Sequence, residues 1–378
     1  MTVTPITTAA RERGASLPGR ALAPHLYLDP RMLALEQRHI FERTWQLAGH
    51  VSQLPRPGSY LTAQAGTQPL LVVRTQDGAL RAFRNVCRHR GSRLLAGSGQ
   101  CKQAIRCRYH GWTYRLDGEL IGIPENRSFE RPVEKAAHGL LPARVEELCG
   151  LVFVNADPDA PALASLVGDL PDRLARYRIP SLERFAEYAG SGQPANWKVV
   201  AENYLEGYHI PIAHPELMRL LDYAGYRVEV HEHWVWFEAP LRARPAGNRL
   251  TRAYSRLVQP MPGLGEEDRR VWRYAFLYPN TAIDLYPDQI TTWQITPDGT
   301  ARTADVFGSY RPRGSGPRTR LVQHLNQHFN SQVLREDVDL VENVQRGLAT
   351  TGYECGPLSA REAGVAWLAD RVRADLGR

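Results

Sequence analysis

The feature that most constrains this chain is a repeated pairing of one cysteine with one histidine. Cys87 and His89 stand in the run NVCRHRG, and Cys107 and His110 stand in IRCRYHGWTY, with 17 residues between His89 and Cys107. Each run can supply one thiolate and one imidazole from a single tight loop. Two such loops can hold a [2Fe–2S] cluster in which one iron takes two sulfurs and the other takes two nitrogens. Gly91 and Gly111 would let the loops close, because glycine adopts a positive φ without strain.

A zinc site with two cysteines and two histidines is the alternative for these four residues. Zinc fingers, however, usually pair Cys with Cys and His with His, and place a helix between the two halves. Here each half mixes the two residue types and the surrounding runs are typical of strands, which favours the cluster. Cys101 has no His at either spacing and is interpreted as a bystander thiol, whereas Cys149 and Cys355 are interpreted as core residues.

The 378 residues are long enough for two domains of different character. Residues 39–160 are short alternating runs punctuated by glycine, which predicts an all-β domain. Residues 161–378 follow a Pro- and Asp-rich boundary and mix helices with aromatic-rich strands, an α+β pattern in which an antiparallel sheet wraps around a helix. Residues 1–38 are expected to form a polar arm and a helix. The helices predicted in the second half span about 198–209, 214–223, 318–348 and 358–376.

A second group of candidate ligands lies in the run ANWKVVAENYLEGYHIPIAHPEL. Glu206 and His209 are three residues apart and would share one face of a helix. His214 is five residues beyond His209 and would lie off that face in a straight helix. Pro211 stands between the two histidines and is expected to break the helix, so that His214 can turn back toward His209. The two histidines could then bind the same metal ion.

Two histidines need a carboxylate to complete the facial triad of a non-haem iron site. The late run SQVLREDVDLVENVQRGL offers Asp337, which shares a helical face with Val341, Val344 and Leu348. A carboxylate on an apolar face is costly to bury, and metal coordination would offset that cost. The neighbouring acids Glu336 and Asp339 are interpreted as solvated helix charges.

The two groups together resemble the Rieske non-haem iron oxygenases, in particular the terminal oxygenase alpha subunits. CRHRG with CRYHGWTYRLDGEL resembles their Rieske domain, and NWK…ENYLEGYH…H with a late ED pair resembles their mononuclear-iron motif, in the same order. The resemblance implies an N-terminal all-β Rieske [2Fe–2S] domain and a C-terminal helix-grip (START-like) catalytic domain. It further implies cluster ligands at Cys87, His89, Cys107 and His110, and Fe(II) ligands at His209, His214 and Asp337.

The resemblance also implies a homotrimer in which Glu206 joins His209 of one chain to His110 of its neighbour. O₂ would be the co-substrate. Electrons would come from NAD(P)H through a separate reductase, with or without a ferredoxin. The reductase must be another chain, since no GxGxxG run appears in this one. Most ring-dihydroxylating relatives have Asp at the bridging position. A Glu resembles the branch that acts on quaternary ammonium compounds such as carnitine and betaine.

Three functions therefore stay open. Hydroxylation or oxidative demethylation or cleavage of a small organic substrate, such as a quaternary amine, is favoured. For a quaternary cation, Trp234, Trp236, Tyr274, Tyr278, Tyr286 and Trp293 could supply an aromatic cage, and Arg242, Arg244 and Arg249 could hold a carboxylate. Aromatic-ring dihydroxylation or hydroxylation is the alternative. A Rieske electron-transfer or ligand-sensing protein would need a second half without a working iron site.

Charge and hydropathy limit the other partners. The formal charge of +7 comes from basic residues scattered among 40 acids, and no nucleic-acid recognition motif accompanies it. No run approaches the roughly 20 apolar residues of a membrane span. The N-terminal residues lack the apolar core of a signal peptide, and five cysteines do not form a disulfide framework. We therefore expect a cytoplasmic protein that binds neither nucleic acid nor membrane.

Overall fold

The computed structural model describes residues 19–377, which form two compact units. One unit comprises residues 36–173 and 179–184, and we call it the Rieske-like unit. The other comprises residues 19–35, 174–178 and 185–377, and we call it the helix-grip unit. The polar arm expected at the N-terminus falls largely on residues 1–18, which lie outside the described residues.

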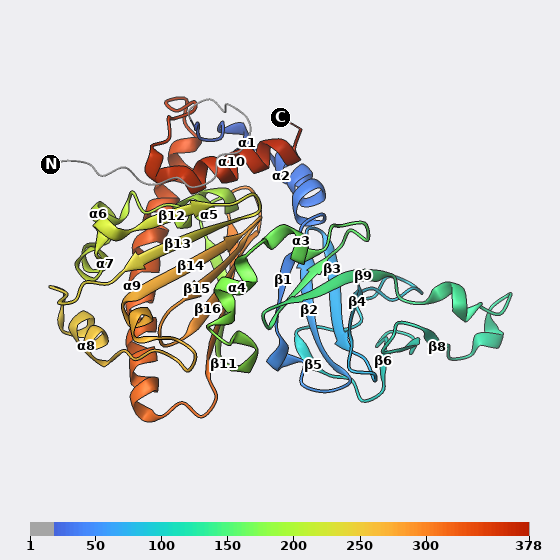
Figure 1. The fold of residues 1–378 in the computed structure, drawn as a ribbon. Helices are drawn as coiled ribbons and strands as arrows, with labels where there is room; N and C mark the ends of the chain where they lie inside the picture. Colours follow the sequence, from blue (N-terminus) through green and yellow to red (C-terminus); the bar gives the residue numbers. More distant parts are fainter. Residues whose placement is uncertain (1–18, 378) are drawn as a thin grey trace. The chain divides into compact units, whose positions relative to one another are not determined.

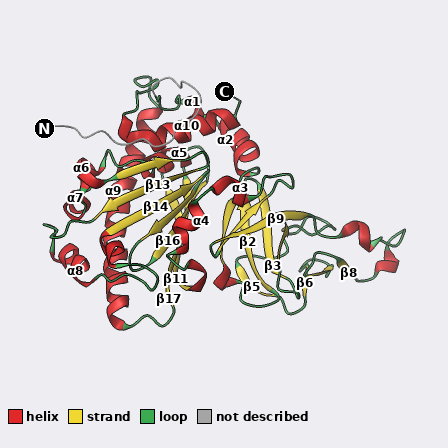
Figure 2. Cartoon of the chain, viewed as in Figure 1, coloured by secondary structure: helices red, strands yellow, loops and turns green. Residues whose placement is uncertain are grey.

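Strands are the main regular secondary structure of the Rieske-like unit (Figure 2). Seven strands form an antiparallel sheet in the order β1-β10-β9-β4-β3-β2-β5, and three short strands form a second sheet in the order β6-β7-β8. Buried aliphatic residues such as Leu70, Val72 and Val152 fill the core of the larger sheet. The strands are β1 (Gln46–His50), β2 (Ser59–Ala65), β3 (Gln68–Arg74), β4 (Leu80–Arg84), β5 (Ser98–Gln100), β6 (Ala104–Arg106), β7 (Thr113–Arg115), β8 (Leu120–Gly122), β9 (Pro142–Leu148) and β10 (Leu151–Asn155).

The helix-grip unit is built on one seven-stranded antiparallel sheet in the order β11-β17-β16-β15-β14-β13-β12. Except for β11, neighbours in the sheet are neighbours in the chain. Short connections join them, apart from the long segment with helix α8 that joins β13 to β14. The long helix α9 (Pro317–Leu348) lies along this sheet, as Figure 1 shows in orange. The strands are β11 (Leu182–Gln193), β12 (Arg227–Val230), β13 (Trp234–Pro240), β14 (Val271–Leu277), β15 (Thr281–Leu285), β16 (Ile290–Pro297) and β17 (Thr303–Pro312).

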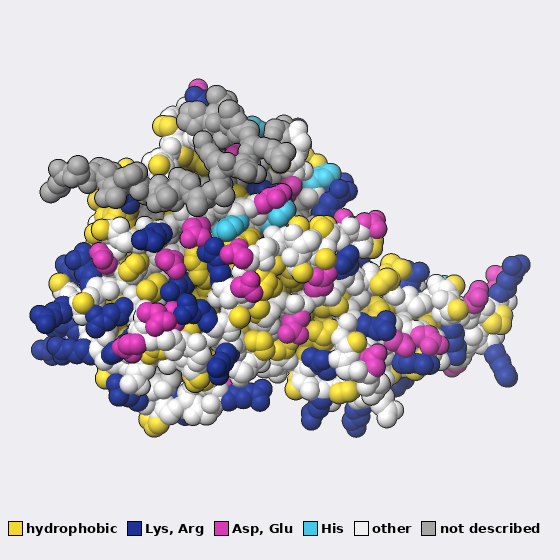
Figure 3. Space-filling view, in the orientation of Figure 1, with side chains coloured by type: hydrophobic (Ala, Val, Ile, Leu, Met, Phe, Trp, Pro, Cys, Tyr) yellow, Lys and Arg dark blue, Asp and Glu magenta, His cyan; other side chains and the backbone are white. Residues whose placement is uncertain are grey.

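Shorter helices complete the two units. Among the described residues, no helix is long and apolar enough to cross a membrane. On the face shown in Figure 3, Lys and Arg side chains lie beside Asp and Glu side chains over much of the surface. The helices are α1 (His25–Leu28), α2 (Pro30–Glu36), α3 (Leu163–Val167), α4 (Leu170–Ala175), α5 (Trp197–Tyr204), α6 (Ile210–Ala213), α7 (Pro215–Leu220), α8 (Arg249–Leu257) and α10 (Ala363–Asp375).

The all-β and α+β characters expected of the two halves are confirmed, with local differences. Strand β11 was not anticipated, because its run LERFAEYAGSGQ contains Ala and Gly residues that disfavour strands. Helix α8, which includes Arg249, was also not anticipated. Cys149 is not a core residue: it is half-buried and takes a positive φ of 47° in the two-residue turn between β9 and β10. Cys355 is also half-buried rather than in the core.

Helix α5 is anchored by the buried side chain of Asn196. Its Oδ1 accepts from Lys198 N (3.0 Å) at the helix N-terminus, and its Nδ2 donates to Tyr27 O (2.8 Å) and Thr300 O (3.1 Å). Asn196 N donates in turn to Gln345 Oε1 (2.8 Å) on α9. One residue therefore joins α5 to α9, to α1 and to the turn between β16 and β17.

We expect Asn196→Ala to lower the free energy of unfolding by about 2–4 kcal/mol, because it removes a cap worth ~1 kcal/mol and leaves buried carbonyls without donors. Asn248→Ala is the matched control, since Asn248 caps α8 with the same geometry but is exposed. Its loss should cost about 1 kcal/mol. Urea titrations followed by tryptophan fluorescence measure both values, and equal costs would contradict the anchoring role of Asn196.

Candidate functional site

The two Cys–His loops of the Rieske-like unit have the same backbone geometry. In the first, Gly91 N donates to Cys87 O, and in the second, Gly111 N donates to Cys107 O, each over 3.1 Å. Both glycines adopt a positive φ, 71° and 74°, as the sequence predicted. Because each loop reverses in the same way, each brings its cysteine and its histidine to the same side.

The four side chains meet at one place. Cys87 and Cys107 are buried and lie in one core cluster with Trp112, and the His89 and His110 rings are 4.7 Å apart. His89 stacks on Trp112, with ring centres 4.9 Å apart, and its buried Nδ1 has no hydrogen-bond partner among the described residues. Burial and the neighbouring His110 lower the pKa of His89. The neutral imidazole that this favours is the form that binds metals, so the donor set fits a Rieske cluster.

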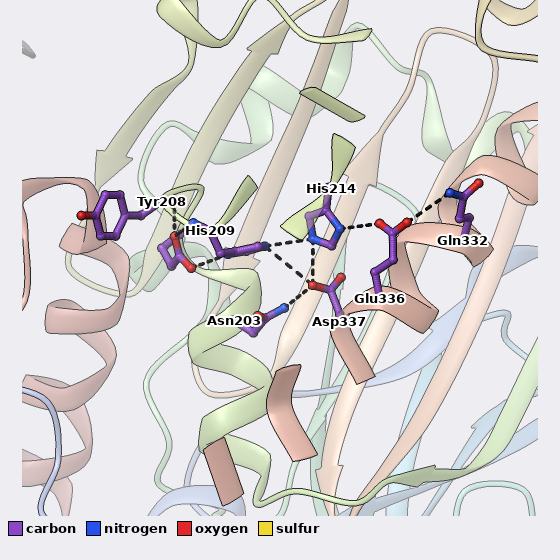
Figure 4. Close-up of polar contacts among 8 residues, drawn as sticks. Asn203, Tyr208, His209, His214, Gln332, Glu336 and Asp337 are labelled. Carbon is purple, nitrogen blue, oxygen red and sulfur yellow. Dashed lines mark hydrogen bonds and ion pairs between the residues drawn. The ribbon is translucent and has the colours of Figure 1, made fainter. Parts of the chain in front are cut away.

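The candidate iron ligands of the helix-grip unit also converge (Figure 4). The Nε2 atoms of His209 and His214 lie 3.1 Å apart, and Asp337 Oδ1 lies 3.0 Å from His214 Nε2 and 3.7 Å from His209 Nε2. Two nitrogens about 2.1 Å from one ion at a right angle would be about 3 Å apart. The three residues therefore fit one metal ion bound on one face, with the remaining positions open.

Two prolines bring the histidines together. Helix α5 ends at Tyr204, so Glu206 and His209 lie in the following loop and not on a shared helical face, which corrects the sequence prediction. The short helix α6 has Pro211 in its first turn. His214 precedes Pro215 and takes a non-helical ψ of 74°, since a residue before proline disfavours the α region. The chain therefore turns at both histidines, and their rings can face each other.

Each histidine also has a carboxylate on its other ring nitrogen. Glu206 contacts Nδ1 of His209 and also accepts from the backbone N–H groups of Tyr208 and His209. Glu336 Oε2 lies 2.7 Å from Nδ1 of His214. Such carboxylates fix the orientation of a ligand imidazole. The interpretation of Glu336 as a solvated charge was wrong, because the turn at His214 brings the His214 ring to α9. In the sequence, the only indication of this role is that Glu336 stands next to Asp337.

Asp337 lies on α9 where the sequence placed it, but the apolar face is slightly different. Val341 and Leu348 are buried with Gln345, whereas Val344 is 49% exposed. Asn203 Nδ2 on α5 donates to Asp337 Oδ1 over 2.8 Å. Burial opposes the protonated form of His214, but Asp337 and Glu336 outweigh that effect and raise its pKa. Positive charge is therefore favoured at this point, from a proton or from a cation.

A cavity of about 570 Å³ opens beside these ligands within the helix-grip unit. Its floor is one face of the sheet, on which cross-strand partners form a row from β13 to β17. Side chains of this row alternate with those that point to the opposite face. The members of the row, all of which line the cavity, are Phe237, Tyr274, Asp284, Thr291 and Ser309.

Two flanking rows add further rings to the same floor. Trp293 and Phe307 are cross-strand partners whose rings stack 5.1 Å apart, and Trp272 lies edge-on to Tyr286 at 4.9 Å. Tyr204 on α5 also lines the cavity, and its ring lies edge-on to those of Tyr274 and Trp293. The floor of the cavity is therefore rich in aromatic rings.

Three of the six aromatic residues predicted for this pocket line it: Tyr274, Tyr286 and Trp293. The others do not. Trp234 and Trp236 are one residue out of phase with Phe237 on β13 and point away from the cavity, where Trp234 stacks on His231. Tyr278 donates to Asp375 Oδ2 over 2.7 Å. None of Arg242, Arg244 and Arg249 is among the described residues that line the cavity.

Comparison with sequence families gives two matches. Residues 172–377 match the family described as "Ring hydroxylating alpha subunit (catalytic domain)", and residues 44–138 match the "Rieske [2Fe-2S] domain". The first match alone covers more than half of the chain. The two regions contain the histidines and carboxylates described above.

Similar proteins include the glycine betaine monooxygenase oxygenase subunit of Chromohalobacter salexigens, 31% identical over 93% of this chain and 85% of that protein. The carnitine monooxygenase oxygenase subunit of Acinetobacter pittii is 30% identical over 86% of this chain and 85% of that one. Among solved structures, a quaternary ammonium Rieske monooxygenase described in relation to carnitine oxidation by gut microbiota superposes with a TM-score of 0.82. It is 27% identical and covers 95% of this chain and 96% of its own.

We expect Glu336→Ala to weaken Fe(II) binding at the candidate site by about 10- to 100-fold, because His214 loses the carboxylate that orients its ring. Asp339→Ala, an exposed acid on the same helix, is the matched control and should bind Fe(II) as the wild type does. Asp337→Ala gives the reference for complete loss of this iron with the cluster retained. Iron analysis and the visible absorption of the cluster measure both sites, and equal affinity in the Glu336 and Asp339 variants would contradict the role of Glu336.

Proposed function

Because the chain belongs to the ring-hydroxylating alpha subunit family of Rieske oxygenases, we propose that it inserts one atom of O₂ into a small quaternary amine, by hydroxylation or by oxidative demethylation or C–N cleavage. The family is shown by the sequence matches. As an oxygenase of this family, the protein uses a [2Fe–2S] cluster, a mononuclear iron and electrons from NAD(P)H delivered by a separate reductase.

We assign Cys87, His89, Cys107 and His110 to the cluster, and His209, His214 and Asp337 to Fe(II). The bound iron would supply the site at which O₂ is activated. Around it, Glu206 and Glu336 contact the Nδ1 atoms of the two imidazoles and orient the rings so that their Nε2 atoms face the metal position. Asn203 holds the Asp337 carboxylate. The aromatic floor excludes water from the space that a substrate would occupy.

The observation that carries the proposed substrate class is that this cavity is both aromatic and acidic. Four carboxylates line it, and the one guanidinium among its described lining residues belongs to the exposed Arg335. Aromatic faces and carboxylates attract a quaternary cation, whereas an aromatic acid would meet charges of its own sign. Several relatives are described as betaine, carnitine or choline monooxygenases, which supports the same class. The lining carboxylates are Glu187, Glu206, Asp284 and Asp337.

We further propose that the protein works as a homotrimer in which Glu206 joins His209 to His110 of a neighbouring chain. Tyr208 is 56% exposed and Ile212 88% exposed on either side of His209, and Tyr109 beside His110 is 57% exposed. Large apolar side chains gathered at two such points are typical of surfaces that another chain covers. Besides the two cysteines assigned to the cluster, three cysteines are in no disulfide, which supports a location in the cytoplasm, where thiols stay reduced.

A single turnover of the dithionite-reduced holoenzyme under ¹⁸O₂ tests the proposed reaction. Choline, glycine betaine and carnitine would be compared with benzoate and other aromatic acids, and the products would be read by mass spectrometry. We expect one labelled oxygen atom in an amine product, or formaldehyde or an aldehyde fragment after cleavage. Two labelled atoms on an aromatic ring would overturn the proposal.

We expect Glu206→Gln to retain both metals but to slow oxidation of the reduced cluster during a single turnover by about 10- to 100-fold. A glutamine amide cannot accept hydrogen bonds through both of its terminal atoms, so the path between two imidazoles is interrupted. Glu232→Gln, at a side chain that is 82% exposed, is the control. Stopped-flow absorption of the cluster gives the rate, and an unchanged rate in the Glu206 variant would exclude the bridging role.

A further inference from the structure

We propose that Asp284 is the counter-anion for the cationic group of the substrate and sets the preference of the cavity for a cation over a neutral molecule of the same shape. This inference rests on the proposed function for the substrate class. It assigns the preference for a cation to one residue of the sheet, which is not a candidate metal ligand.

Asp284 stands in the middle of the aromatic floor. On β15 its cross-strand neighbours are Tyr274 on β14 and Thr291 on β16, and both line the cavity with it. The Tyr204 ring lies edge-on to Tyr274, with centres 6.3 Å apart, and Tyr286 is edge-on to Tyr274 at 6.1 Å. The Tyr204 and Tyr286 rings are thus each perpendicular to the Tyr274 ring, and all three lie beside the Asp284 carboxylate.

The carboxylate is held by phenols and not by a basic group. Tyr204 Oη donates to Asp284 Oδ1 over 2.7 Å, and Tyr286 Oη donates to Oδ2 over 3.3 Å. Among the described residues, no Lys, Arg or His forms an ion pair with Asp284. Burial raises its pKa to about 6, although the two phenol hydrogen bonds act in the opposite direction. At neutral pH the group is therefore mainly an anion, half-buried at the floor of the cavity.

A partly desolvated anion without a cation is costly, and two neutral donors offset the cost only in part. A trimethylammonium group has no N–H and cannot form a hydrogen bond, so charge and aromatic faces are the only means of recognising it. Asp284 supplies the charge and the surrounding rings supply the faces. A substrate cation would therefore stabilise the anion that the free protein keeps at a cost.

A purely structural role would give Asp284 a different signature. If it served only to accept from Tyr204, an asparagine would keep one acceptor oxygen and the same shape, and ligand preference would stay the same. If it pairs with a cation, Asp284→Asn removes the charge while the cavity keeps its rings and volume. Comparison of a cation with its neutral carbon isostere separates the two roles.

The probes are choline and 3,3-dimethylbutan-1-ol, in which carbon replaces the quaternary nitrogen. Their dissociation constants would be measured by calorimetry on the anaerobic, iron-loaded holoenzyme. We expect the wild type to prefer choline by at least about tenfold, and Asp284→Asn to lose most of that preference while binding the alcohol as before. Asp284→Glu, which restores the charge, should recover part of it. Asp305→Asn is the matched control, because Asp305 is a buried acid that accepts from Trp293 Nε1 (2.9 Å) yet does not line the cavity.

An unchanged preference in Asp284→Asn, or a wild type without a preference for the cation, would overturn the inference. If the asparagine variant does not fold, a crystal structure of the wild-type holoenzyme with choline decides: the trimethylammonium group must lie against the Asp284 carboxylate, and any other position in the cavity refutes the assignment. These results concern binding alone. A cation preference that depends on Asp284, without an oxygenated product from any quaternary amine, would leave the inference standing and refute the proposed reaction.

Discussion

The helix-grip unit depends on holding three electron-pair donors close enough to repel one another. Two imidazole nitrogens and a carboxylate oxygen meet within 4.8 Å, where they repel one another unless a proton or a metal ion lies between them. The surrounding residues maintain it: Glu206 and Glu336 fix the rings from outside, Asn203 fixes Asp337, and α9 supplies two of the acids from consecutive positions. Much of the fold around the site follows from this requirement. Helix α5 must end before His209, and the loop after it must turn at both histidines. Helix α9 must lie along the sheet so that Glu336 and Asp337 reach His214.

The floor of the cavity also follows from simple geometry. A seven-stranded antiparallel sheet offers one row of side chains every second residue, so a few strands can present a continuous aromatic surface without any irregular backbone. Only one member of the central row, Asp284, is ionisable below pH 7. The metal ligands come from helices and loops and the substrate surface comes from the sheet, so the two can be positioned almost independently.

The sequence alone predicted the two-part α+β organisation and the residues that converge, because their spacing carries chemical meaning. The separation of His209 from His214, broken by Pro211, and the acid on the inner face of the last long helix both led to the right neighbours. Local geometry was harder to predict. Helix α5 ends at Tyr204 because of contacts made by the following loop, including the Tyr223 hydroxyl that donates to Gly207 O over 2.8 Å. Such contacts come from the tertiary structure.

The cavity was predicted less well for a related reason. An aromatic-rich strand indicates that rings are present, but a shift of one residue exchanges the two faces of the sheet. Trp234 and Trp236 were therefore expected on the wrong side, and Phe237, Trp272 and Phe307 were missed. The role of Asp284 also depends on this phase, since a lone acid in the run TAIDLYP carries no signal until its neighbours across the sheet are known.

The end of helix α5 has a consequence for how this protein can diverge. Asn203 and Tyr204 are consecutive, yet one bonds the candidate metal ligand Asp337 and the other bonds Asp284 in the cavity floor. A substitution that moves this turn would disturb both hydrogen bonds at once, so we expect the sequence at this turn to change slowly in evolution. Phe237, Thr291 and Ser309 line the cavity from strands that carry no candidate metal ligand. New substrate ranges should therefore arise through these sheet positions, where a changed side chain reshapes the cavity and leaves the iron ligands in place.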